Sequence, residues 1–175
     1  MEARRQELLA DLHAVNPSEW GPHLWRMLHW LAEQVGNQKS KILQGDEINA
    51  WKKLFRIVAN IVPCAMCKGH YLEYLKANID VEKIGFVEGD ERRELIRRWL
   101  WELHEDVNMR REVEGVPFES LGEICSSIDF IVERDALYEV LMRALRKNIV
   151  TRDNITQFKT AINTLFGMYR VLGKR

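Results

Sequence analysis

Two cysteines near the middle of the chain are its sharpest chemical feature. The run Cys64-Ala65-Met66-Cys67 holds two thiols three residues apart, directly after Pro63. A proline at that place predicts that a helix starts at Cys64, where unpaired backbone N–H groups and the positive end of the helix dipole stabilise a thiolate. A thiolate is the nucleophile of disulfide exchange, and two thiols this close can form a reversible disulfide. The spacing therefore predicts dithiol redox chemistry.

Two other interpretations of the same pair stay open. With His70, the cysteines could form a structural zinc site, although no second Cys-X-X-Cys or paired histidine follows at the spacing of a zinc finger. Free cysteines are also among the most buried residue types, so the pair could be an inert part of the core. A haem attachment site is excluded, because Lys68 follows Cys67 where that motif requires histidine. On spacing alone, redox chemistry ranks ahead of metal binding, and metal binding ahead of an inert core.

Two further groups of side chains have the spacing of one helix face. Trp25 and His29 lie four residues apart, as do His104 and Asn108, and Trp101 precedes His104 by three. Residues three or four apart lie on the same side of a helix. Tryptophan and histidine at this spacing more often belong to a packed core than to a cofactor site. Each group taken alone therefore predicts core.

The elements that must position these residues are helices. Strand signals are nearly absent, whereas apolar residues recur at helical spacing. The pattern predicts helices that run from Asn16, as the capping residue, to about 36, from 46 to 62, from Cys64 to about 78, and from about 90 onward. Two more are predicted at 127–148 and 153–172. The first four predict a four-helix bundle, because each apolar stripe must find a partner stripe.

Composition and charge limit the class of protein. The chain has 175 residues, of which 46% are hydrophobic and 30% charged, which is a globular balance. Lysine plus arginine equals aspartate plus glutamate at 26 each, so we expect no nucleic-acid partner. The sequence contains no apolar run long enough to span a membrane, and residues 1–15 lack the apolar stretch of a signal peptide. We therefore expect a cytoplasmic protein with no membrane partner.

The sequence changes in character after Gly115-Val116-Pro117. Residues 126–175 carry nine basic and five acidic side chains, in a chain that is neutral overall. We therefore divide the chain into a domain at 1–125 and a C-terminal helical extension at 126–175, to which the sequence assigns no role. A basic cluster in the extension is expected to be a solvated helix face, because no aromatic residues interleave with it.

Three segments together resemble the Erv/ALR family of FAD-linked sulfhydryl oxidases. Residues 20–32 are similar to the family's opening motif G-x-x-x-W-x-x-L-H-x-x-A, and residues 64–67 to its redox Cys-X-X-Cys. Residues 99–108 resemble its W-L-x-x-x-H-N-x-V-N motif. The segments come in the family's order over about residues 18–120, and three in register are specific. With one cysteine pair and no second, shuttle pair, the chain resembles the compact members that large DNA viruses encode.

The resemblance implies a fold, a cofactor and a reaction. The fold would be all-α, a four-helix bundle cradling FAD with a C-terminal helical extension, and the protein would be a flavin-linked thiol oxidase that forms a homodimer. A thiol-containing protein substrate would attack Cys64 at the exposed helix start, Cys67 would lie at the flavin, and molecular oxygen would be reduced to hydrogen peroxide. No metal is implied. By the same likeness, FAD would be bound by Gly21, Trp25, His29, Trp101, His104, Val107, Asn108 and Arg111, with Arg110 as an alternative to Arg111 at the pyrophosphate.

Some features depart from the family or leave rivals open. Glu105 stands where many members carry asparagine, so we expect its side chain to turn to solvent or to pair with an arginine. The third cysteine, Cys125, is expected to be a buried bystander. The main rival is a non-enzymatic helical interaction module with a structural zinc at the Cys-X-X-Cys. A flavin-free dithiol exchange protein is a third hypothesis, against which the lack of a βαβ pattern argues.

Overall fold

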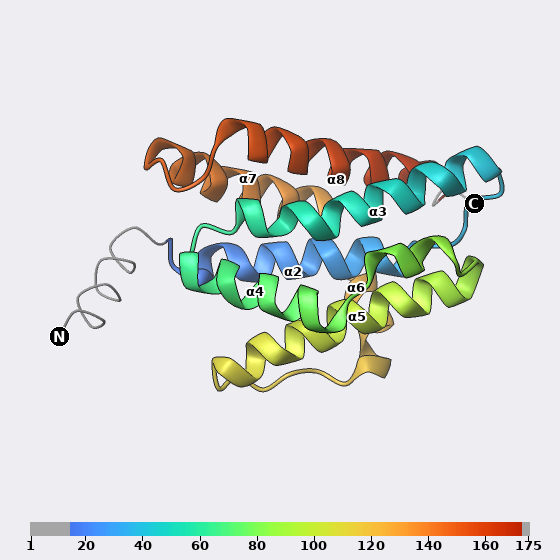
Figure 1. Ribbon diagram of the computed structural model, residues 1–175, viewed down its shortest axis with the longest axis horizontal. Helices are drawn as coiled ribbons and strands as arrows, with labels where there is room; N and C mark the ends of the chain where they lie inside the picture. Colours follow the sequence, from blue (N-terminus) through green and yellow to red (C-terminus); the bar gives the residue numbers. More distant parts are fainter. Residues whose placement is uncertain (1–14, 173–175) are drawn as a thin grey trace.

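All regular secondary structure in residues 15–172, the part of the chain that the computed structural model describes, is helical (Figure 1). The prediction of an all-α fold is therefore confirmed. The expectation about a signal peptide concerns residues that lie almost wholly outside this range. The helices are α2 (Pro17–Glu33), α3 (Lys41–Ile61), α4 (Ala65–Asn78), α5 (Gly89–Arg110), α6 (Leu121–Ser126), α7 (Phe130–Arg146) and α8 (Arg152–Leu172), with the 3-10 helices η1 (Val81–Gly85) and η2 (Phe118–Ser120).

Local signals place most helix ends correctly. Asn16 caps α2 as predicted, because its side-chain oxygen accepts the backbone N–H of Ser18 at 3.0 Å, and Pro17 occupies the first turn. The predicted start of α3 after 46 is wrong: the helix begins at Lys41 and Gly45 lies inside it. Its first turn is largely solvent-exposed, so the apolar periodicity that indicates a helix begins only later.

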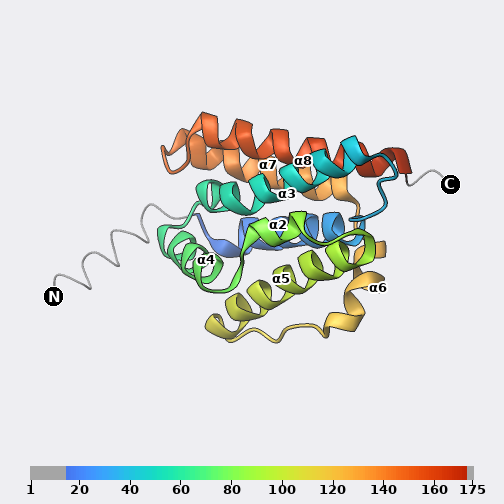
Figure 2. The same ribbon diagram turned by 45° about the vertical axis from the view of Figure 1, so that its right-hand side comes forward.

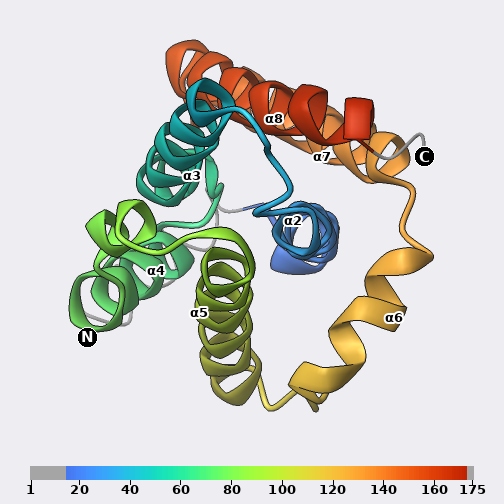
Figure 3. The ribbon, with the colours of Figure 1, turned by 90° about the vertical axis from the view of Figure 1, so that its right-hand side faces the viewer.

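The helices form layers around α2 and α3. Helix α7 packs on α2 and α8 packs along α3, whereas α5 and α4 contact α2 and α3 from the other side. Figures 1 and 2 show α7 and α8 together on the side opposite α4 and α5. Figure 3, which looks along the helices, shows α6 on the side of α2 and α5 that faces away from α3 and α4. The first four helices thus form the predicted bundle, and the extension covers one face of it.

The apolar core is continuous from the bundle into the extension. Leu31 and Leu54 of the bundle belong to the same buried cluster as Leu141 of α7 and Phe158 of α8. Leu72 of α4 is exposed although it is a large apolar residue. The physical reason is that α4 rests mainly on α3, so only a narrow face of α4 is covered. Among the described residues, no helix combines the length and the apolar composition needed to cross a membrane.

A buried polar network ties α8 to the bundle. The Tyr169 hydroxyl donates to Glu47 Oε1 at 2.8 Å and accepts the Trp51 indole N–H at 2.9 Å. The other oxygen of Glu47 lies 3.4 Å from Nη1 of Arg92, whose remaining donors reach the backbone oxygens of Ile84 and Val87. Buried polar groups stabilise a fold only when they are paired in this way. The extension is therefore fixed to α3 and α5 by specific bonds as well as by its apolar stripe.

Candidate functional site

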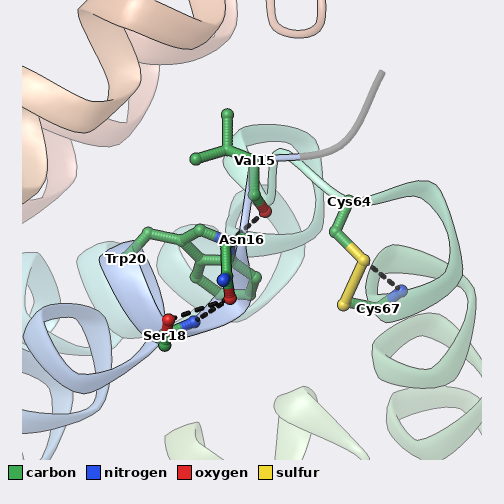
Figure 4. The surroundings of a disulfide bond; sticks show 6 residues. All are labelled: Val15, Asn16, Ser18, Trp20, Cys64 and Cys67. Carbon is green, nitrogen blue, oxygen red and sulfur yellow. Dashed lines mark hydrogen bonds between the residues drawn. A yellow bond between two sulfur atoms is a disulfide. The ribbon is translucent and has the colours of Figure 1, made fainter. Parts of the chain in front are cut away.

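The redox pair lies where α3 gives way to α4. Pro63 lies in the short connection after α3, and Cys64 is the N-cap of α4. The backbone N–H of Cys67 donates to Cys64 Sγ at 3.2 Å. The two residues form a disulfide with their Cα atoms 5.3 Å apart (Figure 4). An amide N–H and the positive end of a helix both favour a thiolate on Cys64 when the bond is reduced. The predicted helix start and the predicted disulfide are confirmed.

The two cysteine residues differ in exposure, in the opposite sense to the prediction. Cys64 is 6% exposed, whereas Cys67 is partly exposed, so the expectation that Cys64 lies exposed at the helix start is wrong. The chain just before α2 lies beside it: the backbone N–H of Val15 donates to the Pro63 oxygen at 2.9 Å, and the Trp20 indole N–H donates to the Val15 oxygen at 3.2 Å (Figure 4). This long-range contact has no local sequence signal.

Cys67 lines an apolar cavity between the bundle helices, which we call the thiol pocket. Its volume is about 220 Å³. Most of its walls are apolar side chains of α2 and α3 that face the cavity, such as Leu24, Leu28 and Val58. Its lining includes Cys67, Gly21, Trp25, Val107 and Arg111, with His70 and Tyr71 on the α4 side.

A second cavity of about 320 Å³, the histidine pocket, lies between α2, α5, α6 and the loop before α6. It is lined by His29, His104 and Asn108, by Val113 and Val116 of the loop, and by side chains of α6 that include Cys125. The two pockets adjoin, because both are lined by Gly21, Trp25, Val107 and Arg111. Of the residues expected to bind FAD, Trp101 alone lines neither pocket.

Three rings from two helices form a stack at the boundary of the two pockets. The Trp25 and His104 rings are nearly parallel, 8° apart in plane and 4.1 Å between centroids. His29 Nε2 lies 3.0 Å from His104 Nδ1, so one imidazole donates to the other. The predicted one-face spacings on α2 and α5 thus place these residues in contact across helices. Such flat faces suit a planar ligand.

Both imidazoles are neutral at physiological pH. Burial, together with the charges of His104 and Arg97, lowers the pKa of His29 from 6.5 to about 3. Burial also lowers the pKa of His104 from 6.5 to about 4. A neutral pair can share one hydrogen bond, whereas two buried cations 3.0 Å apart would repel each other. The site therefore presents uncharged rings to any ligand.

This pair makes the stability of the fold depend on pH. In the unfolded chain each imidazole regains a pKa near 6.5, so below that pH the unfolded state binds more protons than the folded state. The free energy of unfolding therefore decreases as the pH is lowered from about 6.5 to the lowered pKa of the folded state. Between pH 7 and pH 5 we expect wild type to lose about 2 kcal/mol more unfolding free energy than His29→Gln, because wild type takes up one more proton on unfolding. Urea unfolding at both pH values measures this. Identical pH dependence in the two proteins would contradict the buried neutral pair.

The charged groups at the pocket mouth differ in how they are engaged. Arg110 Nε donates to Asp106 at 2.8 Å, whereas Arg111 forms no ion pair within the described range and lines both pockets. Glu105 neither turns fully to solvent nor pairs with an arginine, so that expectation is wrong. Its carboxylate accepts the amide N–H of Asn108 at 3.1 Å and lies against Gly115, in the space that a Cβ at Gly115 would occupy.

Cys125 is a buried free thiol in the wall of the histidine pocket. Burial, with the nearby Glu33 charge, raises the pKa of its thiol to about 12, so it stays protonated and unreactive. We expect native, unreduced protein to give no reaction with a thiol reagent such as DTNB, and unfolded protein to give one equivalent. A full equivalent from native protein would contradict the burial of Cys125.

Within residues 15–172, no group of three or more histidine, cysteine, aspartate or glutamate side chains is arranged to hold a metal ion. The zinc alternative at Cys64, Cys67 and His70 has no ligand set there.

Comparison with known proteins gives one match. The model of the Erv1/Alr family matches residues 22–123, which carry α3, α4, α5 and most of α2. No curated protein and no solved structure matches the chain.

Proposed function

Because the chain belongs to the Erv1/Alr family, we propose that it is an FAD-dependent thiol oxidase that introduces disulfides into protein substrates. Sulfhydryl oxidation is the activity that this family suggests. One observation carries the proposal for this chain: the Cys64–Cys67 disulfide opens α4, and Cys67 lies in the wall of a pocket shared with Trp25. An interaction module would have no need of a redox pair at the edge of such a cavity.

The residues of the two pockets fit the parts of FAD. The apolar thiol pocket suits the flat ring system of a flavin, and the neutral His29 and His104 offer faces for stacking on adenine. Arg111, which lines both pockets, would meet the pyrophosphate between them. Gly21 is buried, yet a Cβ built on it meets no atom within 4 Å, so open space adjoins the α2 backbone there. That space admits a ligand close to the helix.

We assign the two sulfurs different roles in the exchange with substrate. A substrate thiolate attacks Cys64 Sγ, the Cys64–Cys67 bond breaks, and the electron pair stays on Cys67 as a thiolate. A second substrate thiol then attacks the mixed disulfide, so that substrate leaves as a disulfide and Cys64 leaves as a thiolate. The Cys67 N–H and the start of α4 stabilise that leaving group. Two thiols of substrate are oxidised and one protein disulfide is reduced.

The chemistry that bound FAD would supply is two-electron oxidation of the reduced cysteine pair, with dioxygen as the acceptor and hydrogen peroxide as the product. The part of this chain is to hold the Cys67 sulfur at the thiol pocket, with Trp25 and Val107 as walls. Apolar walls keep water from the thiolate and raise its reactivity.

The burial of Cys64 leaves a second route for the first attack. Cys67 is the more exposed residue of the pair, and attack on its sulfur would release the amide-stabilised Cys64 thiolate directly. Attack on Cys64 instead requires local movement near the Val15–Pro63 contact. We favour Cys64, because a ligand in the thiol pocket would cover Cys67 and because the electrons then arrive beside that ligand. The homodimer and the viral type stay predictions from the family resemblance, and the cytoplasmic location stays a prediction from the amino-acid sequence.

The purified protein tests the proposal directly. We expect a yellow protein that releases FAD on denaturation and that consumes oxygen with dithiothreitol, one hydrogen peroxide per disulfide formed. A flavin spectrum, chromatography of the released cofactor and an oxygen electrode measure these. Colourless protein with stoichiometric zinc would support the interaction module instead. Colourless protein that exchanges disulfides without consuming oxygen would support a flavin-free exchange protein.

A further inference from the structure

The wall of the histidine pocket includes a segment with no regular secondary structure. Residues 111–117 connect α5 to η2, and Val113 and Val116 of this loop line the pocket. Near its start the loop is tied to α5 by the backbone N–H of Val113, which donates to the Asn108 oxygen at 3.0 Å. An extended segment with few bonds of its own needs side chains from neighbouring elements to hold it in place.

Four side chains supply that hold, and we call them the aromatic clamp: Trp101, Phe118, Arg97 and Arg98. The indole N–H of Trp101 donates to the Val116 oxygen at 2.8 Å. The Trp101 ring meets the Phe118 ring edge-on, with centroids 5.8 Å apart and planes at 72°. Trp101 therefore contacts this segment twice, through a hydrogen bond to Val116, which lines the pocket, and through ring packing on Phe118 at the start of η2.

The two arginines complete the clamp and connect it to α2. The Arg98 guanidinium lies 3.7 Å from the centre of the Phe118 ring, and that of Arg97 lies 4.7 Å from it. Arg97 Nε also donates to Glu33 Oε1 at 2.7 Å, and both side chains of this pair are mostly buried. Cations over an aromatic face attract it most strongly where water is partly excluded. Phe118 is thus held from α5 through arginines, one of which is fixed to α2.

We propose that the aromatic clamp is a positioning device for the histidine pocket, and that Trp101 acts on the ligand through loop 111–117 instead of touching it. Neither Trp101 nor Phe118 lines the pocket, whereas Val116, which Trp101 holds, does. The identity of the ligand as FAD rests on the proposed function. The positioning of the loop does not, so the two ideas fail separately.

The test combines two clamp variants with one matched control. Trp101→Phe keeps a ring but removes the N–H that holds Val116, and Phe118→Leu removes the ring between the arginines and Trp101. Trp30→Phe makes the same chemical change as the first variant on the opposite side of the bundle, where Trp30 packs on Phe130 and Phe166. Hydrogen exchange of loop 111–117 is measured without cofactor, and the Kd for FAD by flavin fluorescence.

Each clamp variant should raise loop exchange and the Kd for FAD by about tenfold, the effect of losing one hydrogen bond or aromatic contact. Trp30→Phe should change neither. Unchanged loop exchange in both clamp variants would overturn the proposal. A higher Kd with unchanged exchange would also overturn it, since Trp101 would then touch the ligand directly. If wild type binds no FAD, the proposed function fails, and the exchange measurement still decides the role of the clamp.

Discussion

Cys67→Ser should lower thiol-dependent oxygen consumption by at least about a thousandfold, because a serine hydroxyl cannot carry the electron pair that the reaction delivers to this position. Flavin content should stay that of wild type, since serine is close to cysteine in size and Cys67 is only one part of the thiol pocket. An oxygen electrode with dithiothreitol and the absorbance spectrum of the bound flavin give the two readouts. Full activity in this variant would show that electrons do not pass through Cys67.

The same variant, compared with Cys64→Ser, decides which sulfur the substrate attacks. If exchange with substrate takes place at Cys64, Cys67→Ser should accumulate a mixed disulfide when it is mixed with the disulfide form of a protein substrate, in the reverse of the proposed reaction. The free Cys64 thiolate attacks the substrate disulfide, one substrate thiolate leaves, and no neighbouring thiol of this protein resolves the adduct. Cys64→Ser should then accumulate little. Non-reducing electrophoresis and mass spectrometry of the adduct measure this. Accumulation in Cys64→Ser alone would place the first attack on the more exposed Cys67 and would reverse the assigned order.

Gly21→Leu should weaken FAD binding by about tenfold to a hundredfold without harming the fold, because the new side chain fills the open space beside α2. The flavin-free variant should be as stable as wild type or more so, by up to about 1 kcal/mol, since glycine is the poorer helix former. Urea unfolding and flavin fluorescence separate these effects. If Gly21→Leu lost FAD binding through general destabilisation, both its FAD affinity and its unfolding free energy would be lower than those of wild type.

Gly167→Leu is the matched control for this change. Gly167 also lies inside a helix, α8, and a Cβ built there also meets nothing within 4 Å, but it is exposed to solvent and lines neither pocket. We expect a similar gain in helix stability and an unchanged Kd for FAD. Wild-type FAD affinity in Gly21→Leu would mean that the ligand does not use the space next to α2.

Much of the site could be predicted because its signals are local. Asn16 before Pro17 is sufficient to start α2, and Pro63 before Cys64 to start α4, since capping depends on groups within one turn. The separations of Trp25 from His29 and of His104 from Asn108 likewise fix one helix face each. The short α6, which forms part of the histidine pocket, could not be predicted, because six residues are too few to show a period.

The sequence by itself determined the all-helical fold, the helix that begins at the cysteine pair, and the faces that carry the aromatic and imidazole side chains. Only the tertiary structure decided that His29 meets His104, which is 75 residues away, and that Trp101 holds a loop instead of lining a pocket. It also decided that Cys64 is the more buried cysteine of the pair. The physical reason is that periodicity and capping act within a few residues, whereas burial and pairing depend on which helix faces pack together. That choice is made by the summed contacts of the whole core.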